Sequence, residues 1–203
     1  MVRFYEEKEN LKKMKTQKNQ DDGINPKGAR WPIHTKLKML LWRGVNATLF
    51  RYSPFFFYGW RRFLLRMFGA VIAKGATTAR SAIIDSPWNL TMGENSMIAR
   101  NAWVMCSGKV HIGKNSLIGE YAKILAGSHK SSSKDYDFVM APIYIEDECW
   151  IASGAMVVAG GTRPLKIGRG AIVGAGSVVF SNVKAMTIVV GNPAEYLTDR
   201  VVE

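Results

Sequence analysis

From residue 72 onward, large apolar residues recur at every sixth position of the chain, with short interruptions. They form five sets of three, namely Ile72, Thr78, Ile84; Met92, Ile98, Val104; Ile112, Ile118, Ile124; Ile145, Ile151, Val157; and Ile167, Val173, Val179. Fourteen of these fifteen positions are apolar, and Thr78 is the exception. A period of six fits neither an amphipathic helix nor an ordinary half-buried strand, because their periods are about 3.6 and 2.

A column of small residues follows the apolar column four positions later. Its members are Ala76, Ala82, Ser96, Ala102, Gly108, Ser116, Ala122, Ser128, Cys149, Ala155, Gly161, Ala171 and Ser177. Only Trp88 and Val183 break it. A six-residue repeat is the signature of a β-helix, in which each hexad forms one flat face and three hexads complete a triangular coil. The sequence therefore predicts an all-β solenoid, a parallel β-helix of about five coils, over residues 69–203.

The first third of the chain lacks this repeat. Residues 1–32 are polar and rich in Lys, Asn and Gln, which predicts a tail with little structure of its own. Over residues 33–68, apolar residues recur at helical spacing in two groups: Leu37, Leu40, Leu41, Val45, Leu49 and Phe50, then Trp60, Phe63, Leu64, Met67 and Phe68. Ser53 and Pro54 are expected to separate two helices, with Ser53 as the N-cap of the second.

Most of the excess positive charge also lies in this first third. The 203-residue chain has a formal net charge of +12; residues 1–68 hold 15 basic and 5 acidic side chains, and residues 69–203 hold 13 and 11. No apolar run reaches the roughly 18 residues of a membrane span. Residues 35–68 therefore have two interpretations. They form a helical pair packed on the domain or on a neighbouring subunit, or an in-plane membrane anchor with its Lys and Arg at anionic headgroups.

The overall composition excludes several classes of protein. With 47% hydrophobic and 22% charged residues, wholesale disorder is excluded. Two cysteines exclude a disulfide scaffold. Together with the absence of a secretory signal at the N-terminus, they predict a cytoplasmic protein, peripheral on the inner face of the membrane under the second interpretation. No aromatic and basic stripe appears within the repeat, so no nucleic-acid partner is expected.

Three segments carry a resemblance to a known family. They are Ile151-Ala-Ser-Gly-Ala, Ile167-Gly-Arg-Gly-Ala-Ile-Val-Gly-Ala-Gly-Ser-Val-Val and Val190-Gly-Asn-Pro-Ala. They resemble the hexapeptide-repeat acyltransferases, and most closely the sugar O-acetyltransferases of bacterial exopolysaccharide and capsule synthesis. The resemblance implies left-handed coils, a homotrimer with sites between subunits, acetyl-CoA as the acyl donor and a sugar as the acceptor.

Acyl transfer to a hydroxyl needs a base, and a histidine with a pKa near 6.5 suits this task at neutral pH. His34 lies in the polar lead-in and His111 on a coil surface, whereas His129 ends a hexad where the repeat breaks into the polar segment 130–142. Loops that leave a rigid scaffold commonly carry function. A lone loop histidine is usually not catalytic, but the family's catalytic histidine stands in a matching Gly-Ser-His context, which implies that His129 is the base.

The resemblance implies further site residues. It matches Asn101 to an acceptor-side asparagine, Trp150 to a tryptophan on the pantetheine arm, Ser153 to the backbone donor for the thioester oxygen, and Ala175 to a coil beside coenzyme A. Asn101 has the alternative of a turn asparagine, and Trp150 that of a core or trimer-contact aromatic. Asp85 is an additional acceptor-side carboxylate, suggested by its early position in the repeat.

Two positions depart from the family pattern for binding the coenzyme phosphates, because Ser181 and Glu195 stand where basic residues are common. Glu195 would repel a phosphate. Arg163 and Lys166 are the replacements we expect, with Arg169, Lys184 and Arg200 as further candidates.

The sequence thus favours an acetyl-CoA-dependent sugar O-acetyltransferase that uses no metal, since a metal site would need several histidines. The alternatives are a non-catalytic trimeric scaffold at a membrane and an N-acetyltransferase for an amino sugar. Cys106 and Cys149 are conceivable acyl carriers, but Cys149 falls in the column of small residues and is expected to pack instead.

Overall fold

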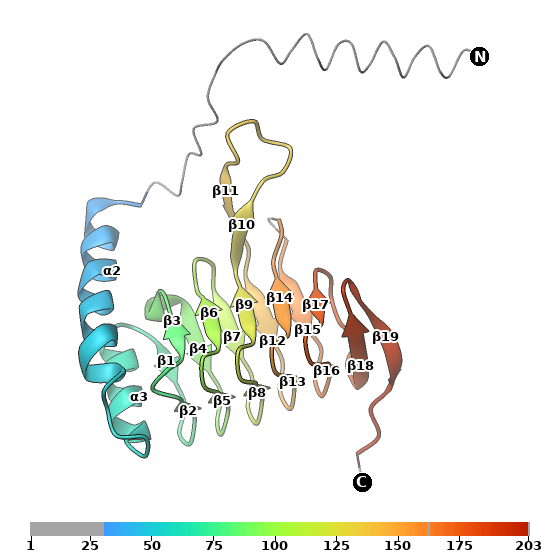
Figure 1. Ribbon diagram of the computed structural model, residues 1–203, viewed down its shortest axis with the longest axis horizontal. Coiled ribbons are helices and arrows are strands. Elements are labelled where there is room, and N and C mark those ends of the chain that lie inside the picture. Colours follow the sequence, from blue (N-terminus) through green and yellow to red (C-terminus); the bar gives the residue numbers. More distant parts are fainter. Residues whose placement is uncertain (1–30, 162, 203) are drawn as a thin grey trace.

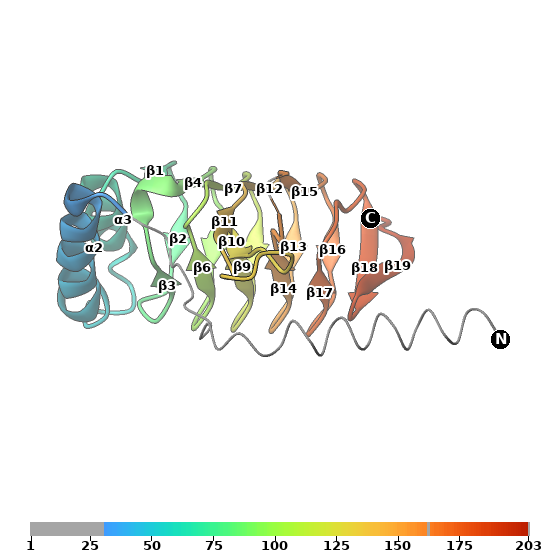
Figure 2. The same cartoon turned by 90° about the horizontal axis from the view of Figure 1, so that it is seen from above.

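The computed structural model describes residues 31–161 and 163–202, so nearly all of the expected polar tail lies outside the described residues. The repeat forms a three-sided parallel solenoid (Figures 1 and 2). Sheet A contains β1 (Val71–Ile72), β4 (Leu90–Met92), β7 (Val110–Ile112), β12 (Ile143–Ile145) and β15 (Leu165–Ile167). Sheet B contains β2 (Thr77–Thr78), β5 (Met97–Ile98), β8 (Leu117–Ile118), β13 (Trp150–Ile151), β16 (Ile172–Val173) and β18 (Thr187–Gly191). Sheet C contains β3 (Ile83–Ile84), β6 (Trp103–Met105), β9 (Lys123–Leu125), β14 (Met156–Val158) and β17 (Val178–Val179).

The six-residue period is the path of the chain from one sheet to the next. Each set of three apolar positions contributes one residue to sheet A, one to sheet B and one to sheet C, and all fifteen are at most 5% exposed. Equivalent positions of successive coils pair directly with one another in each sheet. These side chains therefore stack along the axis of the prism and form its core. After five full coils, Val183 and Val189 begin a sixth, and β18 then turns back into the antiparallel strand β19 (Ala194–Asp199).

The column of small residues distinguishes the three corners of the prism. At the corners that join A to B and B to C, its members are at most 3% exposed, because no larger side chain fits there. The corner that joins C to A is irregular. It holds the insertions 85–89 with the short helix η3 (Pro87–Asn89), 106–109, 126–142 and 159–164, and also Trp88 and Val183, which break the column. Insertions are tolerated where the chain already leaves the regular turn.

The longest insertion forms a hairpin that projects from the prism (Figure 1). Its strands are β10 (Gly127–His129) and β11 (Phe138–Met140), which pair antiparallel with His129 opposite Phe138.

The N-terminal segment forms a helical cap on the first coil (Figures 1 and 2). It comprises α2 (Ile33–Val45), the π-helical turn η2 (Asn46–Phe50) and α3 (Tyr58–Met67). The helix after Ser53 begins only at Tyr58, so the N-cap prediction for Ser53 is wrong. The Ser53 hydroxyl instead donates to the Phe50 carbonyl and accepts from the guanidinium of Arg61.

The cap satisfies an edge that a solenoid leaves open. Backbone N–H groups of the first coil donate to the second coil, as Thr77 does to Ser96 at 2.8 Å, so carbonyl oxygens of the first coil face its open end. Four side chains donate to them: Arg66 to Ile72, Arg62 to Ala76, Arg61 to Thr78 and Trp42 to Ile84. Since unpaired backbone acceptors are costly when buried, these donors explain why the basic segment packs on the solenoid.

Candidate active site

His129 stands at the base of the hairpin, just beyond the edge of sheet C. Its Nδ1 lies 2.6 Å from the backbone carbonyl oxygen of Tyr136, and its ring meets the Phe138 ring edge-on with centroids 5.3 Å apart. A carbonyl oxygen can only accept a hydrogen bond, so the neutral imidazole carries its proton on Nδ1. The lone pair of Nε2 is then available to take a proton, which is the tautomer a general base needs.

The hairpin loop is ordered by its own hydrogen bonds. The Ser133 hydroxyl donates to Asp137 Oδ2 at 2.7 Å, and the Tyr136 N–H donates to the Ser133 carbonyl at 3.2 Å. Tyr136 has a φ of 49°, a left-handed conformation that aims its carbonyl toward the imidazole. Gly127 has no room for a Cβ, which would lie 2.8 Å from the ring of Phe138. The loop therefore fixes the histidine at a defined place rather than leaving it on a free tether.

The corner between sheets B and C holds a second set of predicted residues. In the repeat register, five residues stack two positions after the sheet B core residue: Arg80, Arg100, Glu120, Ser153 and Ala175. Asn101 follows Arg100 and adopts a φ of 57°, so the turn interpretation accounts for an asparagine there. Its side chain is exposed, which leaves it available to a ligand as well.

A cavity of about 600 Å³ opens where this corner meets the helical cap. Its lining includes Phe55 and Tyr58 from the cap and Arg80, Arg100 and Asn101 from the corner. Arg100 is paired with Glu120 at 2.9 Å. The residue pattern had not indicated the cap residues or either arginine as part of a site. The repeat register could have found the arginines, since they occupy the same column as Ser153 and Ala175.

Asp85 lies at the other corner, between sheets C and A. Its Oδ2 accepts a hydrogen bond from Trp103 Nε1 at 2.9 Å. Burial raises the pKa of this carboxyl, while the hydrogen bond from Trp103 and the positive charge of Arg43 act in the opposite direction. Asp85 thus already has a partner within the chain.

Trp150 lies on the outer surface of sheet B, where its side chain is 46% exposed. The core interpretation of this tryptophan is therefore wrong. An exposed indole at the centre of a flat sheet offers a surface for a ligand or for a neighbouring subunit.

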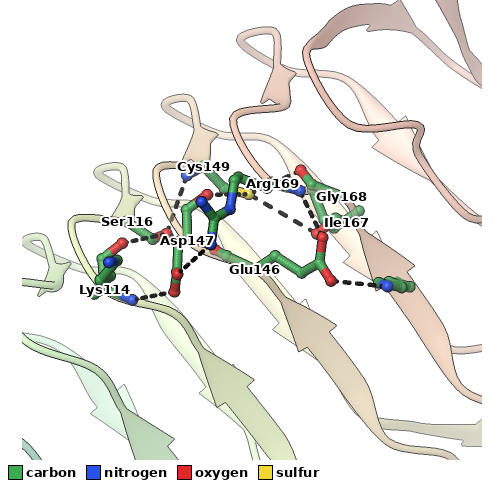
Figure 3. A network of polar contacts seen from close by, with 9 residues as sticks. Lys114, Ser116, Glu146, Asp147, Cys149, Ile167, Gly168 and Arg169 are labelled. Atoms are coloured by element: carbon green, nitrogen blue, oxygen red, sulfur yellow. Dashed lines mark hydrogen bonds and ion pairs between the residues drawn. The ribbon is translucent and has the colours of Figure 1, made fainter.

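The basic residues expected at the coenzyme phosphates differ in how they are engaged. Arg163 is exposed and lines a cavity of about 660 Å³ together with Phe180 and Ser181. Lys166 forms an ion pair with Glu146 at 2.8 Å. Figure 3 shows that Arg169 reaches Asp147 in a network at the corner between sheets A and B. Arg200 donates to the carbonyl oxygens of Glu148 and Gly170.

The predicted site residues form two groups in one chain. His129, Asp85 and Arg163 lie at the C-to-A corner, whereas Asn101, Ser153 and Ala175 lie at the B-to-C corner; Lys166 lies on sheet A and Trp150 on sheet B. His129 is exposed, and it lines neither of the two cavities described above. Sheet C separates the two groups, so a single chain does not bring them together.

The sequence is similar to those of proteins named as acetyltransferases. No protein-family model matches the chain. It is 38% identical over 176 residues to the protein of Escherichia coli K12 named as the colanic acid biosynthesis acetyltransferase WcaF, a match that covers 87% of this chain and 93% of the relative. The chain belongs to the family of hexapeptide-repeat acetyltransferases.

Solved structures confirm the fold of this acetyltransferase as a left-handed parallel β-helix. Galactoside acetyltransferase in complex with coenzyme A has a TM-score of 0.74 at 20% identity, covering 84% of each chain. The hexapeptide-repeat acetyltransferase VCA0836 from Vibrio cholerae has a TM-score of 0.73 at 21% identity, covering 83% of this chain and 93% of the other. A maltose O-acetyltransferase from Clostridium difficile 630 has a TM-score of 0.72 at 22% identity, covering 84% and 90%.

The two cysteines of the acetyltransferase are packed away from reactive surfaces. Cys106 and Cys149 are both at most 1% exposed, and burial raises the pKa of each thiol, that of Cys149 to about 11. A thiol is nucleophilic only as thiolate, so neither is prepared to carry an acyl group. Within residues 31–161 and 163–202, no three His, Cys, Asp or Glu residues are grouped as metal ligands.

Proposed function

We propose that the protein transfers an acetyl group from acetyl-CoA to a hydroxyl group of a sugar in a glycan or glycan precursor. The observation that carries this proposal is the hydrogen bond from His129 Nδ1 to the Tyr136 carbonyl, because it leaves Nε2 as an oriented base. Membership of the acetyltransferase family supports the reaction class. Two of the similar folds were solved with coenzyme A or acetyl-CoA, which supports the donor.

The reaction proceeds by direct transfer. The sugar oxygen attacks the thioester carbonyl carbon while its proton passes to His129 Nε2. A C–O bond forms, and the negative charge on the carbonyl oxygen is held by the backbone N–H at Ser153. The C–S bond then breaks, and the coenzyme A sulfur leaves with the proton returned by the imidazolium. Much of the rate arises from holding both substrates at one junction.

The proposed assembly is a homotrimer with its active sites at the junctions between subunits. The two groups of site residues lie at the two corners on either side of sheet C, which supports this assembly. A threefold axis facing sheet C would bring the C-to-A corner of one protomer to the B-to-C corner of the next. His129 of one subunit would then face Asn101 and Ser153 of its neighbour. The exposure of His129 in a single chain is consistent with a site completed by a partner.

On the donor side, Trp150 packs on the pantetheine arm and Ala175 lines the path of the coenzyme. Arg163 binds a phosphate of the coenzyme, and Lys166 contributes less because Glu146 already compensates its charge. On the acceptor side, Asn101 orients the sugar in the cavity beside Tyr58, and Asp85 lies near the other corner. The proposed division of the chain is a tail over residues 1–32, a cap over 33–68 and a catalytic domain over 69–203. The proposed enzyme is cytoplasmic and contacts the membrane peripherally.

The proposal is tested with His129→Ala and the release of free coenzyme A thiol from acetyl-CoA over a panel of sugars. We expect kcat to fall by roughly 10²- to 10⁴-fold, the usual contribution of a general base. His111→Ala is the matched control, since His111 is also exposed but lies on sheet A. Unchanged turnover in His129→Ala, with the variant folded, would reject the base assignment. Turnover with amino sugars but not with hydroxyl acceptors would move the activity to N-acetylation.

A further inference from the structure

The helical cap presents an apolar surface on the side that faces away from the solenoid. In α2, Trp42 is buried against the first coil and donates to Ile84. Ile33, Leu37 and Leu40 recur at i, i+4 and i+7, which places them on one stripe roughly opposite Trp42. They are 85%, 57% and 65% exposed. A stripe of exposed aliphatic residues is not needed to pack this helix on the solenoid.

Helix α3 repeats this arrangement. Its Arg61, Leu64 and Leu65 are buried toward the solenoid, whereas Trp60, Phe63 and Met67 form an exposed stripe at i, i+3 and i+7. Trp60 and Phe63 stack with their ring centroids 5.7 Å apart. The connection between the helices adds the exposed residues Leu49, Tyr52, Phe55, Phe56 and Phe57. We call this surface the end face of the cap.

All charged side chains of the cap, residues 31–68, are basic. No Asp or Glu occurs between residues 23 and 84. Arg61, Arg62 and Arg66 donate to the first coil, so these three side chains are engaged by the solenoid. Other cations of the cap remain at the surface, and they are Lys36, Arg43 and Arg51.

The carboxylate nearest in sequence to the cap is that of Asp85, which is engaged with Trp103. Lys38 is also engaged, since its ammonium lies 4.6 Å from the centroid of the Trp88 ring. The end face therefore combines exposed aromatic and aliphatic side chains with the exposed basic side chains of Lys36 and Arg51, and the cap itself supplies no carboxylate. This is the composition of surfaces that lie in the interface of an anionic bilayer.

We infer that the end face docks on an anionic lipid bilayer, with the axis of the solenoid directed away from the membrane. Leu37, Leu40, Phe63 and their neighbours would enter the boundary between headgroups and acyl chains, and the surface Lys and Arg would lie among the phosphates. No helix within the described residues is long and apolar enough to cross a membrane, so the contact is peripheral. In a homotrimer of parallel solenoids, three end faces would lie at the same end and bind together.

This orientation places the proposed catalytic centre near the lipid surface. His129 belongs to the third coil, two strand spacings of about 4.8 Å above the first, and the cap adds a helix layer of about 10 Å. The imidazole would thus stand roughly 20 Å from the bilayer, within reach of a sugar attached to a membrane lipid. This last step alone rests on the proposed function.

Vesicle flotation tests the docking. The full chain should float with vesicles of phosphatidylglycerol and phosphatidylethanolamine, bind phosphatidylcholine vesicles weakly, and dissociate from the anionic vesicles in high salt. The double variant Leu40→Glu, Phe63→Glu should lose binding by roughly tenfold or more, because two apolar contacts become carboxylates. Leu197→Glu is the matched control, since Leu197 has a similar exposure and lies on β19 at the other end of the solenoid.

Two results would overturn the inference. One is equal flotation of the double variant and the chain itself. The other is a change in oligomeric state of the double variant in the absence of lipid, which would make the end face a contact between subunits. Thermal unfolding and coenzyme A binding of the double variant should remain unchanged, so a loss of flotation is separated both from misfolding and from a failure of the proposed chemistry.

Discussion

Asn101 and His129 lie at opposite ends of the strands of sheet C. Asn101 is in the turn that leads into β6, and His129 follows the end of β9. A shared active site therefore requires residues of two chains. We predict that His129→Ala and Asn101→Ala, each of low activity alone, complement one another when expressed together. Random mixing would leave about a quarter of the junctions with both native residues, and a comparable fraction of the activity.

The complementation assay contains its own control. Two different substitutions at one position, His129→Ala with His129→Gln, cannot restore a junction and should stay inactive together. If the His129 and Asn101 variants give no more activity together than separately, the two residues do not act across an interface.

The exposed Arg163 should matter more to the donor than the paired Lys166. Arg163→Ala removes a cation from the cavity beside Ser181, and we expect the KM for acetyl-CoA to rise about tenfold with little change in kcat, since a phosphate is bound equally in ground and transition states. Lys166→Ala should raise it less, because Glu146 already neutralises Lys166. Steady-state kinetics with acetyl-CoA as the varied substrate measures both. An unchanged KM in Arg163→Ala rejects its role.

Arg61 should carry much of the attachment of the cap. Its guanidinium is fully buried and donates to the Thr78, Pro54 and Phe55 carbonyls as well as to Ser53. Arg61→Met leaves these acceptors unpaired and should lower the free energy of unfolding by about 3 kcal/mol. Arg62→Met, which removes a single partly buried hydrogen bond to Ala76, should cost less than about 1 kcal/mol. Urea denaturation compares the two, and equal losses would contradict the assignment.

Thr78 is the polar exception in the apolar column, and its hydroxyl is buried without a hydrogen-bond partner among the described residues. Replacing it with the nearly isosteric valine removes an unsatisfied group. We therefore expect Thr78→Val to raise the free energy of unfolding by about 1 kcal/mol. Thr77→Val, at the half-buried neighbouring position, should change it by less than about 0.5 kcal/mol. A destabilised Thr78→Val would show that the hydroxyl has an unrecognised role.

Asp85 should make stability depend on pH. Its native pKa is raised by burial above the ordinary 3.8. As pH rises from the ordinary pKa through the raised one, the unfolded chain ionises more readily than the folded chain, so this group lowers stability over that window. Asp85→Asn keeps an acceptor for Trp103 and lacks the charge. Its melting temperature relative to the native chain should therefore match near pH 3, increase through the window and then stay constant. A difference that shrinks as pH rises would contradict this.

The sequence predicted the catalytic candidate but not its orientation. The break after the Ile124 hexad marked His129, because an insertion interrupts an otherwise regular repeat. Nothing in the residue pattern indicated that the Tyr136 carbonyl would hold Nδ1, since that contact depends on the backbone path of the loop. Similarly, Ser181 and Glu195 indicated that the expected contacts to the coenzyme phosphates depart from the family pattern, but only the ion pair with Glu146 distinguishes Lys166 from Arg163.

The orientation of the side chains in the cap was also beyond what the sequence could predict. Helical spacing predicted two helices between residues 33 and 68, and two are present. Spacing alone could not tell which arginines point inward, because both faces of these helices combine apolar and basic residues. The open carbonyl edge of the first coil decides this, and that edge exists only once the strands have formed.

The sequence by itself determined the solenoid. The six-residue period is a local pattern, because each hexad buries one large residue and turns at one small residue. Every coil therefore forms through the same short-range contacts. The placement of chemistry was decided only by the tertiary structure. The stacking of coils brings Arg80, Arg100 and Ser153 together at one corner of the prism and leaves His129 at another. The packing of the cap on the first coil turns one face of its helices inward and the other outward. These relations join residues far apart in the chain, so they arise from packing and not from local pattern.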